Sequence, residues 1–211
     1  KISKTTYSPK SFNNKYGVPL SLFNLKQNDN FGVFEVGMDK KGEIDNLTKI
    51  IKPDLGIITN ISYAHSKNFK NINGIAKAKS EIIDNIKLGG AIILNADDNF
   101  YKFHKQKAVQ RNLKIFSFSI NNKKSYSKLI KIKNVNRRFQ IFIRINSQKL
   151  SFFSNNNTKS HIQNLLAALT VLSLFFNIKR IPKDIFLDFK LPEGRGDISK
   201  LRLKGKIINF V

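Results

Sequence analysis

The alternation of short apolar runs with helical patterns over the first 120 residues is the strongest constraint on the fold. The apolar runs have the length and the polar boundaries of strands buried in a sheet. They lie at residues 31–38, 55–61, 91–96 and 114–120. Segments with helical spacing lie at residues 42–52, 73–87 and 100–112. Strands that alternate with helices in this way predict a parallel sheet with right-handed crossovers and helices on its faces.

The pattern changes after residue 121. Short apolar stretches separated by polar turns predict antiparallel strands at residues 129–132, 139–145 and 150–153. Residues 161–177 show a helical pattern that is apolar on nearly all sides, so this helix should be buried between layers. Further predictions are a short helix at 181–189, a boundary turn at 191–196 and a new strand or hairpin at 201–211. The predicted fold class is therefore α/β, with a mostly parallel sheet flanked by helices and a small antiparallel portion.

The chain carries 38 Lys and Arg side chains against 14 Asp and Glu, a formal net charge of +24 at pH 7. A nucleic-acid binder would show such a charge. The lysines are nevertheless spread from end to end, without a cluster of arginines or a basic tail. A solvated, lysine-rich surface is therefore the favoured interpretation, with a polyanion site as the alternative. A nucleotide substrate would also be attracted, so charge alone does not separate these functions.

The composition also bears on location. The chain has no cysteine, so no disulfide contributes to its stability. The longest apolar run, residues 165–176, is interrupted by Thr170 and Ser173 and is shorter than the roughly 20 residues that a membrane helix needs. The first ten residues lack the apolar core of a signal peptide. These observations predict a cytoplasmic protein without a transmembrane segment.

Two polar side chains accompany the ends of buried strands. Glu35 lies near the carboxyl end of the apolar run 31–38, where a carboxylate is costly unless it is paired or binds a metal. Ligands bind at the carboxyl ends of parallel strands, so a magnesium or substrate role is favoured over a purely structural one. His65 follows the run 55–61 and lies at the same edge if the two strands are neighbours. A single histidine at such a place is more often structural than a ligand.

Lys79 departs from the pattern of its helix. It lies four residues after Ile75 and three before Ile82, and therefore on the apolar stripe, whereas Lys77 points elsewhere. A lysine on a buried face must be neutralised, paired or chemically modified. The alternative is a side chain that extends along the apolar surface and places its ammonium group in water at the edge of the helix.

Two further segments suggest polar ligands. The KTT sequence at residues 4–6 is similar to the end of a phosphate-binding P-loop, but that motif requires a glycine before the lysine, and Ser3 occupies this position. We therefore reject a P-loop here. Residues 11–20 form a polar loop that leads into an apolar segment, and its Asn13 and Asn14 are suited to hydrogen bonding with a polar ligand.

Seven segments, taken together and in order, resemble the Mur ligase family of ATP-dependent amide ligases in peptidoglycan synthesis. The stronger matches are SFNNKYGVPLSL at 11–22, FEVGMDKKGEI at 34–44, KPDLGIITNISYAHSKNF at 52–69, GIAKAKSEI at 74–82 and LNADD at 94–98. The weaker ones are HIQNLLAAL at 161–169 and LPEGRG at 191–196. Each motif alone is weak, but the ordered set covers nearly the whole chain and is highly specific.

The resemblance implies a metal-binding and catalytic set. Glu35 matches a carboxylate that binds magnesium together with the ATP phosphates, and His65 matches a ligand of a second magnesium. Lys79 matches a lysine that carries a carbamate in these ligases. Carbamylation turns a cation into an oxygen ligand of the kind that Mg²⁺ prefers. The implied cofactors are therefore ATP and Mg²⁺.

The resemblance also assigns substrate-binding positions. They are Asn13 and Asn14 for the UDP-sugar-peptide, and Asn60, Asn164 and Arg195 for the nucleotide. The helix signature of the family, G-x-H-N-x-x-N, is only partly kept. Alignment on Asn164 places Ser160 in the His position and His161 in the first Asn position. This departure affects the expected contact with adenine.

The implied activity is the addition of D-Ala-D-Ala to UDP-MurNAc-tripeptide in cytoplasmic peptidoglycan precursor synthesis. ATP phosphorylates the terminal carboxylate, and the amine of D-Ala-D-Ala attacks the acyl phosphate. The implied division is a central, ATP-binding domain at 1–191, without its P-loop, followed by a linker and the first strand of a C-terminal domain at 192–211. We expect a fragment of a longer protein that is inactive alone, a monomer, and no specific nucleic-acid partner.

Two alternatives stay open. The first is another Mur ligase or a folylpolyglutamate synthase, against which the NN-x-x-G-x-P-L block beside EVGM favours the D-Ala-D-Ala-adding member. The second is a basic nucleic-acid-binding module that has merely inherited its likeness to the ligases. It predicts strong, salt-sensitive binding of DNA or RNA, although the chain has no recognised nucleic-acid-binding motif.

Overall fold

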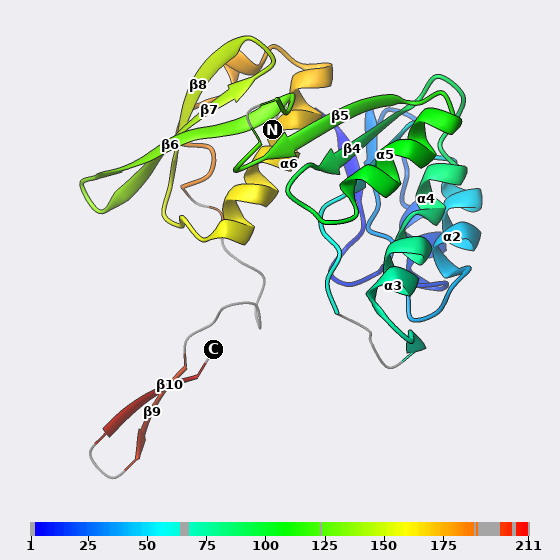
Figure 1. The fold of residues 1–211 in the computed structure, drawn as a ribbon, viewed down its shortest axis with the longest axis horizontal. Helices are drawn as coiled ribbons and strands as arrows, with labels where there is room; N and C mark the ends of the chain where they lie inside the picture. The colour runs from blue at the N-terminus through cyan, green and yellow to red at the C-terminus, as the bar shows by residue number, and fades with distance from the viewer. Residues whose placement is uncertain are drawn as a thin grey trace.

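The computed structural model describes residues 3–63, 68–122, 124–187 and 189, and the backbone of residues 199–203 and 206–210. Its main feature is a six-stranded mixed sheet with the strand order β3-β4-β5-β6-β7-β8 (Figure 1). The sheet has a parallel half and an antiparallel half. This arrangement confirms the predicted α/β class with a small antiparallel portion.

The parallel half of the sheet follows the predicted apolar runs. It consists of β3 (Leu55–Ile58), β4 (Ala91–Asn95) and β5 (Lys114–Ser119). The antiparallel half is a meander of β6 (Ser127–Val135), β7 (Arg138–Ile145) and β8 (Gln148–Ser154). The end of β5 pairs in parallel with the start of β6, so the two halves form one continuous sheet.

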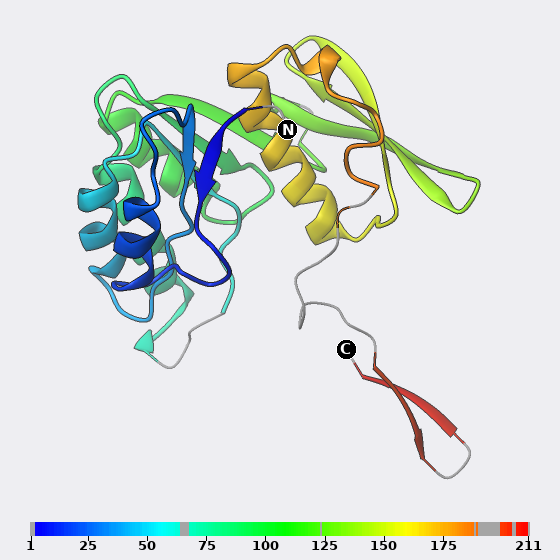
Figure 2. The same cartoon turned by 180° about the vertical axis from the view of Figure 1, so that it is seen from behind.

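Helices cover both faces of the sheet. On one face, α5 (Tyr101–Gln110) packs on β4 and β5, and the short α4 (Glu81–Asp84) lies next to it. Behind α4 lie α3 (Ile72–Lys79) and α2 (Glu43–Ile51), which contact each other and α4. On the other face, α6 (Lys159–Phe175) contacts β4, β5 and β6 (Figures 1 and 2). The long apolar helix therefore lies where the two halves of the sheet join.

Strand β4 shows why both faces need cover. Ile92 and Leu94 belong to the core cluster that contains Ile83 and Ile86, on the side of α4 and α5. Ile93 points the other way and joins the cluster that contains residues of α6. Successive side chains of a strand face opposite sides, so a strand that is apolar at every position must lie between two layers.

A separate two-stranded parallel sheet holds the N-terminal segment. It pairs β1 (Thr5–Tyr7) with β2 (Phe31–Val33), which lie side by side in Figure 2. Helix α1 (Gly17–Phe23) connects the two strands. The predicted strand over 31–38 is therefore strand only at its beginning. Its later residues include Met38, which packs with Ile75 of α3 instead of continuing the sheet.

The predicted helix at 181–189 is wrong over the described residues 181–187 and 189. A 3-10 helix, η2 (Ile178–Arg180), comes first, and the chain after it runs beside β8. Phe153 N–H donates to the carbonyl of Lys183 at 2.7 Å, and Phe186 forms a bridge with Ser154. The failure has a tertiary cause: Phe186 packs edge-on against Phe152 of β8, with ring centroids 5.6 Å apart.

The remaining differences are smaller. The helix predicted over 73–87 is interrupted at Ser80, which separates α3 from α4. The expected hairpin near the C-terminus is present in the backbone as β9 (Ser199–Leu203) paired with β10 (Lys206–Phe210). The boundary turn predicted at 191–196 lies outside the described residues. No helix in the described part of the chain combines the length and apolar character that a membrane crossing requires.

Candidate functional site

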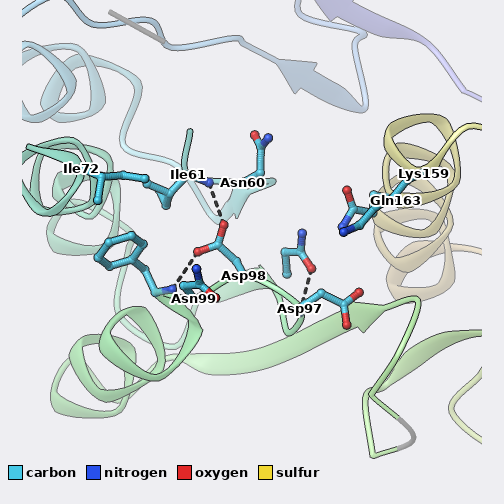
Figure 3. Close-up of a pocket in the computed structure, with 10 residues that line it drawn as sticks. Asn60, Ile61, Ile72, Asp97, Asp98, Asn99, Lys159 and Gln163 are labelled. Atoms are coloured by element: carbon cyan, nitrogen blue, oxygen red, sulfur yellow. Dashed lines mark hydrogen bonds between the residues drawn. The ribbon is translucent and has the colours of Figure 1, made fainter. Parts of the chain in front are cut away.

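A cleft of about 320 Å³ lies at the carboxyl ends of β3 and β4 (Figure 3). Its lining comes from four places in the chain: the loop after β3, the start of α3, the end of β4 with the turn before α5, and the first turns of α6. The residues that matter below are Asn60, Ile61, Asp97, Asp98, Lys159 and Gln163. This is the edge of a parallel sheet at which ligands bind. The position of the cleft agrees with the edge predicted from the sequence.

Asp98 holds two loops together. One of its carboxylate oxygens accepts the Ile61 N–H at 2.8 Å, and the other accepts the Phe100 N–H at 2.8 Å (Figure 3). The first bond reaches the loop after β3, and the second reaches the residue before α5. A carboxylate that accepts backbone N–H groups forms strong, charge-assisted hydrogen bonds. Asp98 therefore fixes the floor of the cleft rather than pointing freely into it.

Asp97 does the same for the next loop. Its carboxylate accepts the Ile120 N–H at 2.6 Å and the Ser119 hydroxyl at 2.5 Å, both at the end of β5. Asn95 completes the arrangement, because its side-chain oxygen accepts the Asp97 N–H at 3.0 Å and its amide donates to the carbonyl of Thr59 at 2.9 Å. The polar residues after β4 thus tie together the ends of all three parallel strands.

Lys79 reaches this edge from α3. Its side chain is half-buried, and its Nζ donates to the carbonyl oxygen of Asn60 at 3.1 Å. Burial lowers the pKa of the Lys79 amine, and the negative charge of Asp98 opposes that shift. Lys77, two residues earlier, is exposed. The expectation that Lys79 lies on the buried side of its helix and Lys77 does not is therefore confirmed.

Glu35 is exposed, so the sequence-based argument from its burial is wrong. Strand β2 ends at Val33, and a carboxylate two residues beyond the strand does not lie in the core. Its side chain accepts the Asn13 amide N–H at 3.0 Å, and its backbone N–H donates to the Ser8 hydroxyl at 3.1 Å. Met38, three residues later, packs on α3. The segment that carries Glu35 therefore leads onto the helix that carries Lys79.

The other predicted residues are spread more widely. His65 and Arg195 lie outside the described residues. Asn14 has a structural partner, because its side-chain oxygen accepts the N–H groups of Tyr16 and Gly17, both at 3.0 Å, at the start of α1. Asn60 lines the cleft, whereas Asn164 is exposed on α6, next to the lining residue Gln163.

The described residues fit a magnesium site only in part. Within the portion of the chain that the structure describes, no group of three Asp, Glu or His side chains is close enough to hold a metal. Glu35 offers a hard oxygen ligand, and Mg²⁺ needs only one or two carboxylates when phosphates and water complete its coordination. Lys79 as an ammonium cannot be a ligand, so its participation requires the carbamate.

Sequence reasoning missed the residues that shape this site. Asp97 and Asp98 were part of the LNADD segment but had no role assigned, and Lys159 and Gln163 were not singled out. Glu81 was also overlooked. This buried carboxylate accepts the N–H of Gly42 at 2.8 Å and of Asp45 at 3.1 Å, and so holds the first turn of α2. The available signal was the pair of acids directly after a buried strand.

Residues 1–172 match the Mur ligase middle domain. The chain belongs to this family. The match covers both halves of the six-stranded sheet and most of α6, and therefore includes the whole cleft. A Mur ligase middle domain with the loops after β3, β4 and β5 tied at one edge is what the structure describes.

Several proteins similar to this middle domain carry the name of the D-alanyl-D-alanine ligase or MurF, and others are a diaminopimelate ligase and L. casei FPGS. The UDP-N-acetylmuramoyl-tripeptide–D-alanyl-D-alanine ligase of Rickettsia prowazekii is 30% identical over 203 residues, 95% of this chain and 44% of the relative. MurF from Acinetobacter baumannii has the same fold, with a TM-score of 0.83 and 24% identity over 99% of this chain and 44% of that protein. MurF ligase from Thermotoga maritima, solved in complex with ADP, has a TM-score of 0.76, with 21% identity over 94% of this chain and 45% of that protein. The chain therefore spans less than half the length of these proteins.

Proposed function

We propose that this chain is the nucleotide-side part of an ATP-dependent ligase that joins D-Ala-D-Ala to UDP-MurNAc-tripeptide. The relative from Rickettsia prowazekii, whose name states this activity, supports the choice of substrates because it aligns with 95% of the chain. The observation that carries the proposal is the cleft at the strand ends, with the half-buried Lys79 bonded to the Asn60 carbonyl beside it. The incoming amine, D-Ala-D-Ala, distinguishes this proposal from other Mur ligases and from folylpolyglutamate synthase.

The chain covers less than half of the relatives' length, and this share guides the assignment of domains and binding sites. We assign residues 1–191 to the central, ATP-binding domain and 192–211 to the linker and the start of a further domain, which includes the paired strands β9 and β10. The P-loop, the site for the UDP group and the site for the incoming amine belong to parts of the longer protein outside this sequence. This is why we expect the chain alone to be inactive, and why ATP, the sugar-peptide and D-Ala-D-Ala are assigned to the whole protein.

The reaction needs charge stabilisation rather than a protein nucleophile. A carboxylate oxygen of the peptide attacks the γ-phosphorus of ATP, the bond to the leaving ADP oxygen breaks, and an acyl phosphate forms. The amine of D-Ala-D-Ala then attacks the acyl carbon, loses a proton and expels phosphate, which leaves an amide. Bound Mg²⁺ neutralises charge on the phosphoryl group in such transfers. Glu35, His65 and carbamylated Lys79 are the residues that we propose would hold it.

Two observations support these roles of Glu35 and Lys79. Asn13 donates to the Glu35 carboxylate and so orients an oxygen ligand that is otherwise exposed. Burial lowers the pKa of Lys79, which favours the neutral amine that can react with CO₂. In that step the Nζ lone pair forms a bond to the carbon of CO₂ and a proton leaves the nitrogen. The product is a carbamate, whose oxygens suit Mg²⁺.

Asn13 and Asn14 are proposed as the contacts for the sugar-peptide, and Asn60, Asn164 and Arg195 as the contacts for the nucleotide. Asn60 has the best support, because it lines the cleft at the end of β3. Asn14 has the least, since its side-chain oxygen is already used to begin α1. Any contact from Asn14 to a substrate would therefore come from its amide group.

The test is an assay of ATP-dependent phosphate release by the full-length protein with UDP-MurNAc-tripeptide and one amine at a time. We expect release with D-Ala-D-Ala and none with diaminopimelate, lysine or glutamate. Lys79→Gln should lower the rate roughly 100-fold or more, the scale on which the loss of one transition-state charge contact acts. Lys77→Gln, an exposed change on the same helix, should leave the rate unchanged. Release with another amine and not with D-Ala-D-Ala would overturn the assignment.

A further inference from the structure

One peptide group at the edge of the cleft is held from both sides. The carbonyl of Asn60 accepts a hydrogen bond from the Lys79 Nζ at 3.1 Å. The N–H of Ile61, which belongs to the same peptide group, donates to Asp98 at 2.8 Å (Figure 3). A trans peptide points its carbonyl and its N–H in opposite directions, and it rotates as one rigid plane. Whatever fixes the N–H of this group therefore also fixes the oxygen that Lys79 contacts.

We propose that Asp98 is a positioning residue that sets the place of the Lys79 amine through the Asn60–Ile61 peptide. The proposal deepens the function proposed above, in which Lys79 takes part in the ligase reaction. Only the effect of Asp98 on catalysis rests on that function; its effect on the position of Lys79 does not. Without the Asp98 carboxylate, the Ile61 N–H loses its acceptor and the peptide plane is free to turn. The Asn60 carbonyl then no longer holds Lys79 against the ends of the strands.

Two simpler explanations for the contacts of Asp98 are helix capping and direct pairing with Lys79. A cap for α5 needs only the local bond from Asp98 to the Phe100 N–H, yet the second oxygen reaches Ile61, which lies 37 positions away in the sequence. Direct pairing is also excluded as the explanation. Among the described residues, no ion pair joins Asp98 to Lys79 within 4 Å, so the hydrogen-bonded link between them runs through the peptide. The negative charge of Asp98 also raises the pKa of Lys79 without a direct contact.

The adjacent aspartate supplies a matched control. Asp97 also accepts backbone N–H groups with its carboxylate, but its partners lie at the end of β5, at Ile120 and Asn121. In the described part of the chain, the hydrogen bonds of its carboxylate do not involve the Asn60–Ile61 peptide. Asp97→Asn and Asp98→Asn therefore remove the same charge from neighbouring positions while loosening different loops. Any effect specific to Lys79 must come from Asp98 alone.

The experiment uses two readouts on the full-length protein that need no turnover. Amide hydrogen exchange, measured by mass spectrometry, reports on the peptide that contains Ile61. The rate of acylation of Lys79, relative to exposed Lys77 in the same digest, reports on how firmly the amine is held. For Asp98→Asn we expect exchange at Ile61 to rise about tenfold or more, as the loss of one charge-assisted bond implies. The Lys79 to Lys77 labelling ratio should rise several-fold. Loss of the Asp98 charge also lowers the pKa of Lys79 and raises this ratio by itself, so exchange at Ile61 is the readout that decides.

Asp97→Asn should speed exchange at Ile120 and leave Ile61 and the labelling ratio as in the wild-type protein. If Asp98→Asn does not fold, Lys79→Gln tests the same link from the other end, and it should also speed exchange at Ile61. The proposal is overturned if a folded Asp98→Asn protein keeps the wild-type exchange at Ile61, whatever its labelling ratio, or if Asp97→Asn changes exchange at Ile61 equally. Absence of ligase activity would count against the proposed function alone, because neither readout depends on it.

Discussion

The parallel and antiparallel halves of the sheet are held together by different means. In the parallel half, the loops are tied by carboxylates that accept backbone N–H groups: Asp97, Asp98 and Glu81. In the antiparallel half, the hairpins close through residues with positive φ, such as Asn136 at 49° and Arg137 at 64°, and the strands are held by apolar packing under α6. Among the described residues, only the first arrangement places carboxylates beside a cleft.

The distribution of acidic residues follows the same division. Residues 1–120 contain ten of the 14 acidic side chains, whereas residues 121–187 contain only Asp184. A carboxylate is needed where strand-end loops must be fixed without backbone pairing. A meander of adjacent strands satisfies its own backbone groups through the ladder. The difference shows that the carboxylates of the described structure lie mainly in the half where strand-end loops have no backbone partners of their own.

The largest expected effect tests whether apolar packing stabilises the antiparallel half. Phe152 of β8 is 1% exposed and lies edge-on to Phe186, with ring centroids 5.6 Å apart. Phe152→Ala removes the ring from the core cluster under α6 and should lower the free energy of unfolding by about 3–5 kcal/mol. Urea unfolding measures it, with Phe152→Leu as the control that keeps most of the volume. A loss below about 1 kcal/mol would mean that this half does not depend on its core.

The next effect tests the hydrogen bonds from backbone N–H groups to carboxylates in the parallel half. Glu81→Gln leaves the N–H groups of Gly42 and Asp45 with a weaker acceptor at a buried position, so we expect a loss of about 1–3 kcal/mol. Asp184→Asn removes the same charge from an exposed site in the other half and should change stability by no more than about 0.5 kcal/mol. Equal losses in urea unfolding would show that charge, and not the tie to the backbone, is responsible.

Acidification should affect both halves through one buried histidine in each. Burial lowers the pKa of His104, with Asp98 opposing and Lys107 and Lys79 adding to the shift, and burial also lowers the pKa of His161. A histidine whose pKa is lower in the folded state takes up its proton on unfolding. Stability should therefore be full above the unfolded pKa of about 6.5 and fall as the pH drops below it, by up to about 1.4 kcal/mol per pH unit for each group.

Denaturant unfolding at pH 7.5 and 5.5 measures how the free energy of unfolding changes with pH. A matched pair of variants separates the contributions of the two histidines. The His104 Nε2–H donates to the carbonyl of Ala76 at 3.2 Å, and the His161 Nε2 bonds to the Ser154 hydroxyl at 2.8 Å. His104→Gln and His161→Gln should each reduce the slope. Stability that increases on acidification would contradict the direction of both pKa shifts.

A smaller effect of opposite sign is expected at the β6–β7 turn. Arg137 has a φ of 64°, in the left-handed region that side chains with a Cβ rarely adopt. Two-residue hairpin turns with positive φ at both positions favour Asn followed by Gly. Arg137→Gly should therefore raise the free energy of unfolding by roughly 0.5–1 kcal/mol. Arg138→Gly, at a strand position without positive φ, is the control and should destabilise.

The smallest expected effect concerns the positive charge. A second hollow of about 510 Å³ on the antiparallel half is lined by Lys131, Lys149, Lys179 and Lys183, with Phe142 and Phe152 among its apolar residues. All four lysines are exposed, so their attraction for a polyanion should be screened by salt. We expect single-stranded DNA to bind weakly at low salt and not at physiological ionic strength. Tight binding at 0.15 M that Lys131→Gln weakens would instead support the nucleic-acid module.

Periodicity predicted the layers because the physical requirement is local. Ile92, Ile93 and Leu94 are apolar in succession, which only a strand covered on both faces explains, and the structure places them in two different cores. Lys79 was found for the same reason, since it interrupts a stripe that must be buried. The helix predicted at 181–189 failed because its apolar residues pack along β8, a tertiary contact that one segment does not reveal.

The site was only partly predictable, because its key contacts join distant residues. The bond between Asp98 and Ile61 spans 37 positions, and Glu81 reaches Gly42 over 39. No local sequence pattern predicts a hydrogen-bond partner this far away in the chain. Glu35 shows the opposite error: its neighbours made it look buried, but β2 ends at Val33 and the carboxylate is exposed. The predicted runs end within one residue of the ends of β4 and β5, whereas β2 ends at Val33, well before the predicted end at residue 38.

The central claim is that Glu35 and Lys79 act together at the carboxyl edge of the parallel strands. A crystal structure of the full-length protein with ADP and Mn²⁺, in which anomalous scattering locates the metal, tests it most directly. The account predicts a Mn²⁺ ion bonded to the Glu35 carboxylate or to a carbamate on Lys79, beside the nucleotide phosphates. Bound ADP with its Mn²⁺ at some other edge of the sheet, and with an unmodified Lys79 far from it, would contradict the account.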